Sequence, residues 1–141
     1  MESSSSVLKE LTLESVKANI YSRNNPTLTP VDIEFYATIV HRILELKKKH
    51  NAVILGHNYM EPLVFGLSEQ GEQGDSLGLS MSAVQTDSDF IIFNGVRFMA
   101  ETAKILNPSK KVLIADKTAG CSLADDFGAE DVRILKEKYP G

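Results

Sequence analysis

Three short apolar runs, each ending in polar or flexible residues, constrain the fold of this chain most strongly. They are residues 52–55, 90–93 and 112–115. A short, wholly apolar run is typical of a strand that is covered on both faces. Patterns with helical spacing separate the runs, and this alternation predicts a parallel sheet with helices on both faces. We therefore predict an α/β protein, a three-layer α/β/α sandwich with a short parallel sheet.

Five helices are expected around these strands, over residues 30–49, 62–69, 76–86, 97–106 and 130–139. The first has clear end signals, because Thr29 can cap it and a lysine cluster suits its C-terminus. Its expected core-facing stripe consists of Phe35, Ile39, Ile43 and Leu46, widened by Val40 and Leu44. Residues 76–86 fit a strand or a helix, and a helix is favoured because Asp75 or Ser76 can cap it.

The length of 141 residues allows one domain and hardly two. We divide the chain into a polar, partly mobile tail, residues 1–28, and a single α/β domain, residues 29–141. The tail has room for one short helix over residues 8–19.

Composition excludes several classes of protein. The net charge is −4, so no global basic face is available for nucleic acid. No apolar run approaches the length of a membrane span, and the N-terminus has no secretory signal pattern. The single cysteine cannot form an internal disulfide, and a reducing cytoplasmic location is the simplest expectation.

Candidate site residues follow the expected strands, where an open parallel sheet binds its ligands. His57 and Tyr59 follow the first strand and could bind a carboxylate or move a proton. A turn histidine with a satisfied hydrogen bond is an equally good interpretation. Ser76 stands at a helix start that suits an anionic oxygen, although a plain helix cap is the more common role.

Two further positions have competing interpretations. Cys121 lies in a loop at the same edge, and from the pattern alone it is either a buried small residue or a nucleophile that would need His57. Arg97 could attract an anion at the start of the expected helix over residues 97–106, or pair with Glu101. No Walker loop, GxGxxG or CxxC motif is present in the sequence.

Taken together, four segments resemble quinolinate synthase in order and spacing. They are "GHNY" after the first strand, "GDSL" before the next helix, "NGVRFMAETAKILNPSKKVLI" and "CSLAD", within about residues 50–127. The resemblance implies an enzyme of NAD biosynthesis that condenses iminoaspartate with dihydroxyacetone phosphate to give quinolinate, with loss of phosphate and water. It also implies a [4Fe-4S] cluster held by three cysteines, with a fourth iron that is open and acts as a Lewis acid on substrate.

The resemblance gives the candidate residues specific roles. Cys121 matches a cluster ligand, His57 a histidine that contacts iminoaspartate, and Ser76 a serine that binds a carboxylate of the same substrate. Tyr59 matches an active-site tyrosine that forms a hydrogen bond or transfers a proton.

The chain also departs from the family pattern, which has three similar α/β domains that each give one cysteine. Only the first is matched here. Either the chain is a truncated piece whose second and third domains are missing, or three copies self-associate and each gives Cys121. Truncation is favoured, because the missing domains supply different substrate residues. The isolated chain is then expected to be weakly active or inactive and to expose apolar surface.

Two other functions stay open at the level of sequence. One is a metal-independent lyase, similar to a hydratase or an aldolase, that uses His57 and Tyr59. The other is a small anion-binding module that uses helix N-termini at the sheet edge.

Overall fold

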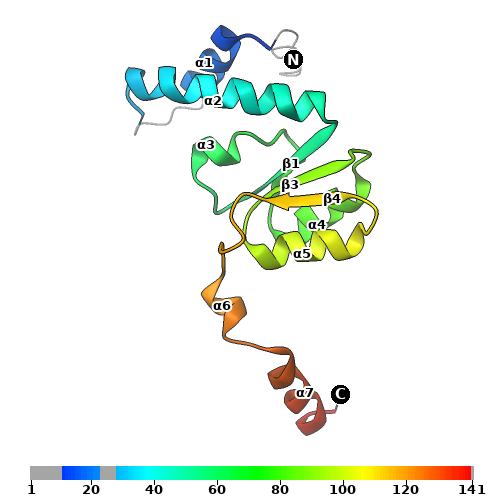
Figure 1. The fold of residues 1–141 in the computed structure, drawn as a ribbon. Coiled ribbons are helices and arrows are strands. Elements are labelled where there is room, and N and C mark those ends of the chain that lie inside the picture. The colour runs from blue at the N-terminus through cyan, green and yellow to red at the C-terminus, as the bar shows by residue number, and fades with distance from the viewer. Residues whose placement is uncertain (1–10, 23–27, 141) are drawn as a thin grey trace, which may run out of the picture.

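The computed structural model describes residues 11–22 and 28–140. Along the chain the elements are α1 (Leu13–Ser22), α2 (Pro30–Lys49), β1 (Ala52–His57), α3 (Pro62–Phe65), β2 (Gln73–Gly74), α4 (Ser76–Gln85), β3 (Phe90–Asn94), α5 (Arg97–Leu106), β4 (Lys111–Ile114), α6 (Ser122–Asp125) and α7 (Ala129–Lys138). Figure 1 shows α2 and α3 on one side of the sheet and α4 and α5 on the other.

The sheet has four parallel strands in the order β2-β1-β3-β4. Ala52 pairs with Phe90, and Phe90 in turn pairs with Lys111, so the carboxyl ends of the strands reach one edge. The predicted class, an α/β protein with a parallel sheet between helical layers, is confirmed. Sequence reasoning missed β2 because it is only two residues long and lies in a stretch of glycines and polar residues.

The main core lies between the sheet and the pair α4 and α5. Leu55, Leu79, Ile91 and Phe93 are fully buried there. Side chains on a strand alternate between the two faces, so every second residue of β1 and β3 enters this core. Ala100 and Ala103 are also buried, and their small side chains bring α5 close to the sheet.

A second core joins α1 to α2, and it corrects the predicted stripe of α2. Its buried residues are Val16, Ile20, Ile33 and Ala37. By contrast Phe35 is 65% exposed and Ile39 43% exposed. Apolar residues surround much of α2, so spacing alone allowed either stripe, and packing against α1 selected the one that contains Ile33 and Ala37. A helix is predicted over residues 8–19, and the structure has one at Leu13–Ser22. Residues 11 and 12 are described and precede that helix, whereas residues 8–10, with other parts of the predicted tail, lie outside the described residues.

Two predicted helix details are wrong. The second expected helix ends at Phe65 instead of residue 69, because Gly66 closes it and the chain then turns. The spacing of Met99, Ala103 and Leu106 predicts one buried stripe on α5, and Met99 and Ala103 are buried whereas Leu106 is 47% exposed. The start of α2 is confirmed, since Thr29 forms a capping box with Asp32.

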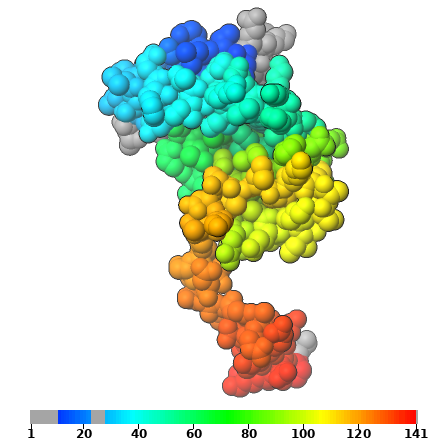
Figure 2. All heavy atoms as spheres, in the orientation of Figure 1, coloured from blue at the N-terminus to red at the C-terminus, as the bar shows by residue number. Residues whose placement is uncertain are grey.

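Helices α6 and α7, after β4, project away from the sheet (Figures 1 and 2). Helix α7 has no buried residue, and its apolar residues Val132, Ile134 and Leu135 are exposed. Leu113 of β4, which points to the opposite face from the main core, is 49% exposed. These residues give the described part of the chain the exposed apolar surface that was expected. Among the described residues, no helix combines the length and apolar character needed to span a membrane.

Candidate active site

The end of β1 is held by backbone hydrogen bonds to the segment of β2. The N–H of Gly56 donates to the carbonyl of Glu72, and the N–H of Asn58 donates to the carbonyl of Gly74. Gly56 also allows the segment after α3 to approach closely, because a Cβ there would lie 2.5 Å from Ser68 Oγ. The strand therefore delivers His57 to the sheet edge on a fixed backbone.

His57 is a buried side chain with one ring nitrogen already engaged. It is 7% exposed, and its Nδ1 accepts a hydrogen bond from the N–H of Tyr59 at 3.3 Å. In the neutral ring this leaves the proton on Nε2, which can donate to a ligand oxygen. The turn interpretation and the ligand interpretation of His57 are thus compatible, because each uses a different nitrogen.

Tyr59 lies against His57 but reaches into solvent. The two rings meet edge to face, with centroids 4.8 Å apart and an interplanar angle of 88°. Tyr59 is 88% exposed, so a ligand at this edge can reach its hydroxyl. The structure therefore brings these two predicted residues together, as their spacing on one strand end indicates.

Ser76 is the first residue of α4, but it is not the helix cap. Asp75 caps the helix, with its Oδ1 accepting from the N–H of Gly78 at 2.7 Å. Ser76 lies two residues after Gly74, the partner of His57 in the sheet register. It lines a hollow of about 230 Å³ together with Leu77, Ser80, Phe98, Met99 and Thr102. The capping role proposed as the alternative thus belongs to Asp75.

Cys121 follows β4 in a loop with two firm anchors. The carboxylate of Asp116 accepts hydrogen bonds from the hydroxyl and the N–H of Thr118, at 2.7 and 2.8 Å. The bond from the Thr118 hydroxyl, followed by that from its N–H, holds the pKa of the Asp116 carboxyl below its usual range. In addition, the N–H of Arg97 donates to the carbonyl of Ala119 at 2.8 Å. The loop is therefore fastened to the start of α5.

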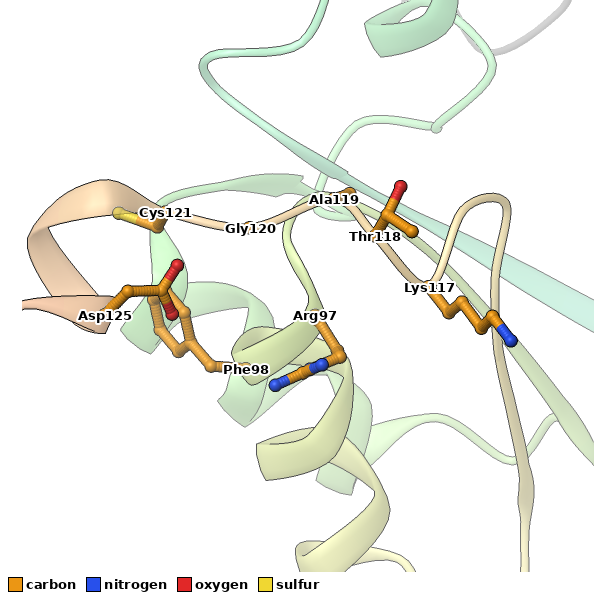
Figure 3. Close-up of a pocket in the computed structure, with 8 residues that line it drawn as sticks. All are labelled: Arg97, Phe98, Lys117, Thr118, Ala119, Gly120, Cys121 and Asp125. Carbon is orange, nitrogen blue, oxygen red and sulfur yellow. The ribbon is translucent and has the colours of Figure 1, made fainter. Parts of the chain in front are cut away.

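Cys121 itself is partly exposed and lines a second hollow of about 130 Å³ (Figure 3). The other lining residues are Arg97, Phe98, Lys117, Thr118, Ala119, Gly120 and Asp125. In Figure 3, Phe98 and Asp125 lie at the Cys121 end and Lys117 at the opposite end. Arg97 pairs with Glu101 on its own helix, at 3.2 Å between Nε and Oε1, so the ion-pair interpretation of Arg97 is confirmed.

Phe98 is the residue that sequence reasoning missed. It lines both the hollow at Ser76 and the hollow at Cys121. It lies in the first turn of α5, four residues after β3 ends at Asn94, and is 39% exposed, and no sequence pattern distinguishes it from other apolar residues at helix starts. The structure thus places Ser76 and Cys121 in two hollows that share one aromatic residue.

An iron–sulfur cluster fits this chain only in part. Cluster iron takes thiolate ligands, and Cys121 offers one at the rim of a hollow. It is the one cysteine in the sequence. Among the residues that the structure describes, no group of three or more His, Cys, Asp or Glu side chains is arranged to hold a metal ion. The chain therefore fits the position of one cluster ligand and does not fit a complete set.

Comparison with known proteins identifies the family. Residues 41–141 match the family model described as "Quinolinate synthetase A protein". The chain belongs to the quinolinate synthase family. The matched range contains all four candidate residues, from His57 to Cys121.

Relatives in the family cover most of this chain. It is similar to quinolinate synthase 2 of Mesorhizobium japonicum, at 47% identity over 92% of this chain and 40% of the relative. It is likewise similar to quinolinate synthase of Agrobacterium fabrum, at 47% identity over 88% of this chain and 36% of the relative. The enzyme of Xylella fastidiosa is 53% identical over 72% of this chain and 30% of the relative. The chain thus spans well under half the length of these relatives.

Proposed function

We propose that this chain supplies one part of a quinolinate synthase active site, which condenses iminoaspartate with dihydroxyacetone phosphate in cytoplasmic NAD biosynthesis. One observation carries the proposal. Ser76 and Cys121 line neighbouring hollows that share Phe98. His57, at the end of β1, pairs with Gly74, which lies two residues before Ser76. Family membership makes iminoaspartate the ligand to test at this edge.

The residues of β1 and α4 would bind the anionic substrate. The Nε2–H of His57 is the donor left over after Nδ1 accepts from Tyr59, and it would donate to a carboxylate oxygen of iminoaspartate. Ser76, whose hydroxyl is not needed for helix capping, would donate to another carboxylate oxygen. The exposed hydroxyl of Tyr59 would hold or move a proton at the substrate.

Cys121 would be one ligand of a [4Fe-4S] cluster, and the remaining ligands would come from polypeptide beyond this chain's single cysteine. When bound, such a cluster supplies an open iron that polarises a hydroxyl or carboxylate oxygen and assists dehydration. The chain's own contribution is to hold the thiol in place, through the Asp116 turn and the bond from Arg97 to Ala119.

The test uses a chimera in which this chain replaces the matching segment of the Agrobacterium fabrum enzyme. Anaerobic kinetics of quinolinate formation would be measured for the chimera and for Ser76→Ala and His57→Ala. We expect the KM for iminoaspartate to rise about tenfold or more in each variant, because each loses a hydrogen bond to a charged group. Ser82→Ala is the control on the same helix: it removes a hydrogen bond to the carbonyl of Gly71 but lines neither hollow, so the KM should stay at the parent value.

The same assay separates the alternatives. A metal-independent lyase would keep its activity in Cys121→Ser. An anion-binding module would bind phosphate yet make no quinolinate in the chimera. The module has less structural support, because Arg97 is paired with Glu101 and Lys117 lies at the far end of the hollow from Cys121.

A further inference from the structure

The two hollows at the sheet edge meet at one side chain. The hollow at Ser76 is formed by α4 and α5, whereas the hollow at Cys121 is formed by the start of α5 and the loop after β4. Phe98 is the residue that the two linings have in common. At 39% exposure, its side chain is neither part of the core nor free in solvent.

The backbone at Phe98 is held in place by its neighbours. Its carbonyl accepts from the hydroxyl of Thr102 at 2.9 Å, and the preceding residue, Arg97, is bonded through its N–H to the carbonyl of Ala119 in the Cys121 loop. The next residue, Met99, is 8% exposed and packs in the main core. The backbone position of Phe98 is therefore fixed between the Cys121 loop and the main core.

We propose that Phe98 is a positioning residue: its ring forms the wall between the two hollows and screens the Cys121 thiol from the Ser76 side. A molecule anchored at Ser76 then meets whatever is bound at Cys121 only past the edge of this ring. The wall also limits the size of solutes that reach the thiol directly. Its role in catalysis rests on the proposed function, but the wall itself does not.

The test is the alkylation rate of Cys121 in the 141-residue chain, which reports on one site because the sequence has a single cysteine. Iodoacetamide serves as the small reagent and fluorescein maleimide as the bulky one. Phe98→Ala should raise the rate with the bulky reagent by about threefold or more relative to the rate with the small one, because thiol reactivity follows access. Phe98→Leu, which keeps most of the bulk, should stay close to the parent.

Leu77→Ala is the matched control, since Leu77 lines only the Ser76 hollow, is 73% exposed and lies on α4, away from the contacts that hold Phe98. An unchanged reagent ratio in Phe98→Ala, or an equal rise in Leu77→Ala, would overturn the proposal. If Cys121 of Phe98→Ala reacts as fast as Cys121 of the chain unfolded in urea, that variant has not folded, and Phe98→Leu and Phe98→Val are compared instead. The ratio of the bulky-reagent rate to the small-reagent rate must then rise from Leu to Val, and an unchanged ratio refutes the wall. Inactivity of the parent chimera would instead count against the proposed function alone.

Discussion

The close approach of Gly56 and Ser68 is a contact on which the position of His57 depends. A Cβ added at Gly56 would lie 2.5 Å from Ser68 Oγ, 3.2 Å from Ser68 Cβ and 3.4 Å from the carbonyl oxygen of Phe65. Ser68 is 2% exposed, so its hydroxyl has no solvent to move into. Overpacking a site of this kind costs about 1–3 kcal/mol, and we expect Gly56→Ala to lower the free energy of unfolding by about 2 kcal/mol.

The second half of this prediction concerns Ser68. Its Oγ is buried and has no hydrogen-bond partner in the described structure. Ser68→Ala should therefore leave the free energy of unfolding within about 0.5 kcal/mol of the parent, because no hydrogen bond is lost. In the double variant the 2.5 Å contact is gone and only the milder contacts remain. The double variant should thus recover about 1 kcal/mol of the loss, which a double-mutant cycle measures as coupling.

The assay is urea unfolding of each variant, followed by far-ultraviolet circular dichroism. Gly74→Ala is the matched control at the same sheet edge, since a Cβ there would meet only Leu79 Cδ2, at 4.0 Å. That control should be neutral or slightly stabilising. The reasoning would be refuted by a Gly56→Ala variant as stable as the Gly74→Ala control, or by losses that add without coupling.

Three more predictions follow from contacts away from the strand end. Lys47 Nζ lies 2.6 Å from a carboxylate oxygen of Glu69 and 3.2 Å from one of Glu72, and its side chain is 12% exposed. Lys47→Met should therefore lower the free energy of unfolding in urea by about 1 kcal/mol, and by less in high salt. An equal loss in the exposed control Lys49→Met would contradict this. Thr29→Ala should lower the unfolding free energy by about 1 kcal/mol, because it removes a helix cap, and no change in thermal unfolding would argue against that cap. Thr118→Val should raise the pKa of Asp116 toward its usual value, since hydrogen bonds from Thr118 lower it. The stability that these bonds contribute is complete above the unfolded-state pKa of Asp116 and is lost as the pH falls through its lower folded-state pKa. NMR titration of the Asp116 carboxyl measures this pKa, and equal midpoints in the parent and in Thr118→Val would refute the assignment.

The strands could be predicted because they are short, wholly apolar and punctuated by polar residues. β1 and β3 have their predicted starts, Ala52 and Phe90, because burial on both faces leaves little choice of residue there. The buried face of α2 could not be predicted, because Ile33 and Phe35 are equally apolar and only packing against α1 decides between them. β2 is defined by two hydrogen-bonded residues, and a pattern that short carries no periodic signal.

The candidate site divides in the same way. His57 and Tyr59 could be placed at the sheet edge from the alternation of strands and helices, and the ring contact between them follows from their spacing. The residue pattern alone left the role of Cys121 open, because metal and redox motifs are recognised by the spacing between cysteines and this sequence has one. A specific role for Cys121 came only from the family resemblance. Phe98 could not be singled out, because its importance arises from two hollows formed by segments distant in sequence.

The central claim is that Cys121 and the sheet edge form part of a quinolinate synthase site, and quinolinate output by the chimera tests it most directly. The chimera and its Cys121→Ser variant would be reconstituted with iron and sulfide under anaerobic conditions and given iminoaspartate and dihydroxyacetone phosphate. The account predicts quinolinate from the chimera, with output in Cys121→Ser at the no-protein background. Equal output from both would contradict it, as would a folded, iron-loaded chimera that makes no product.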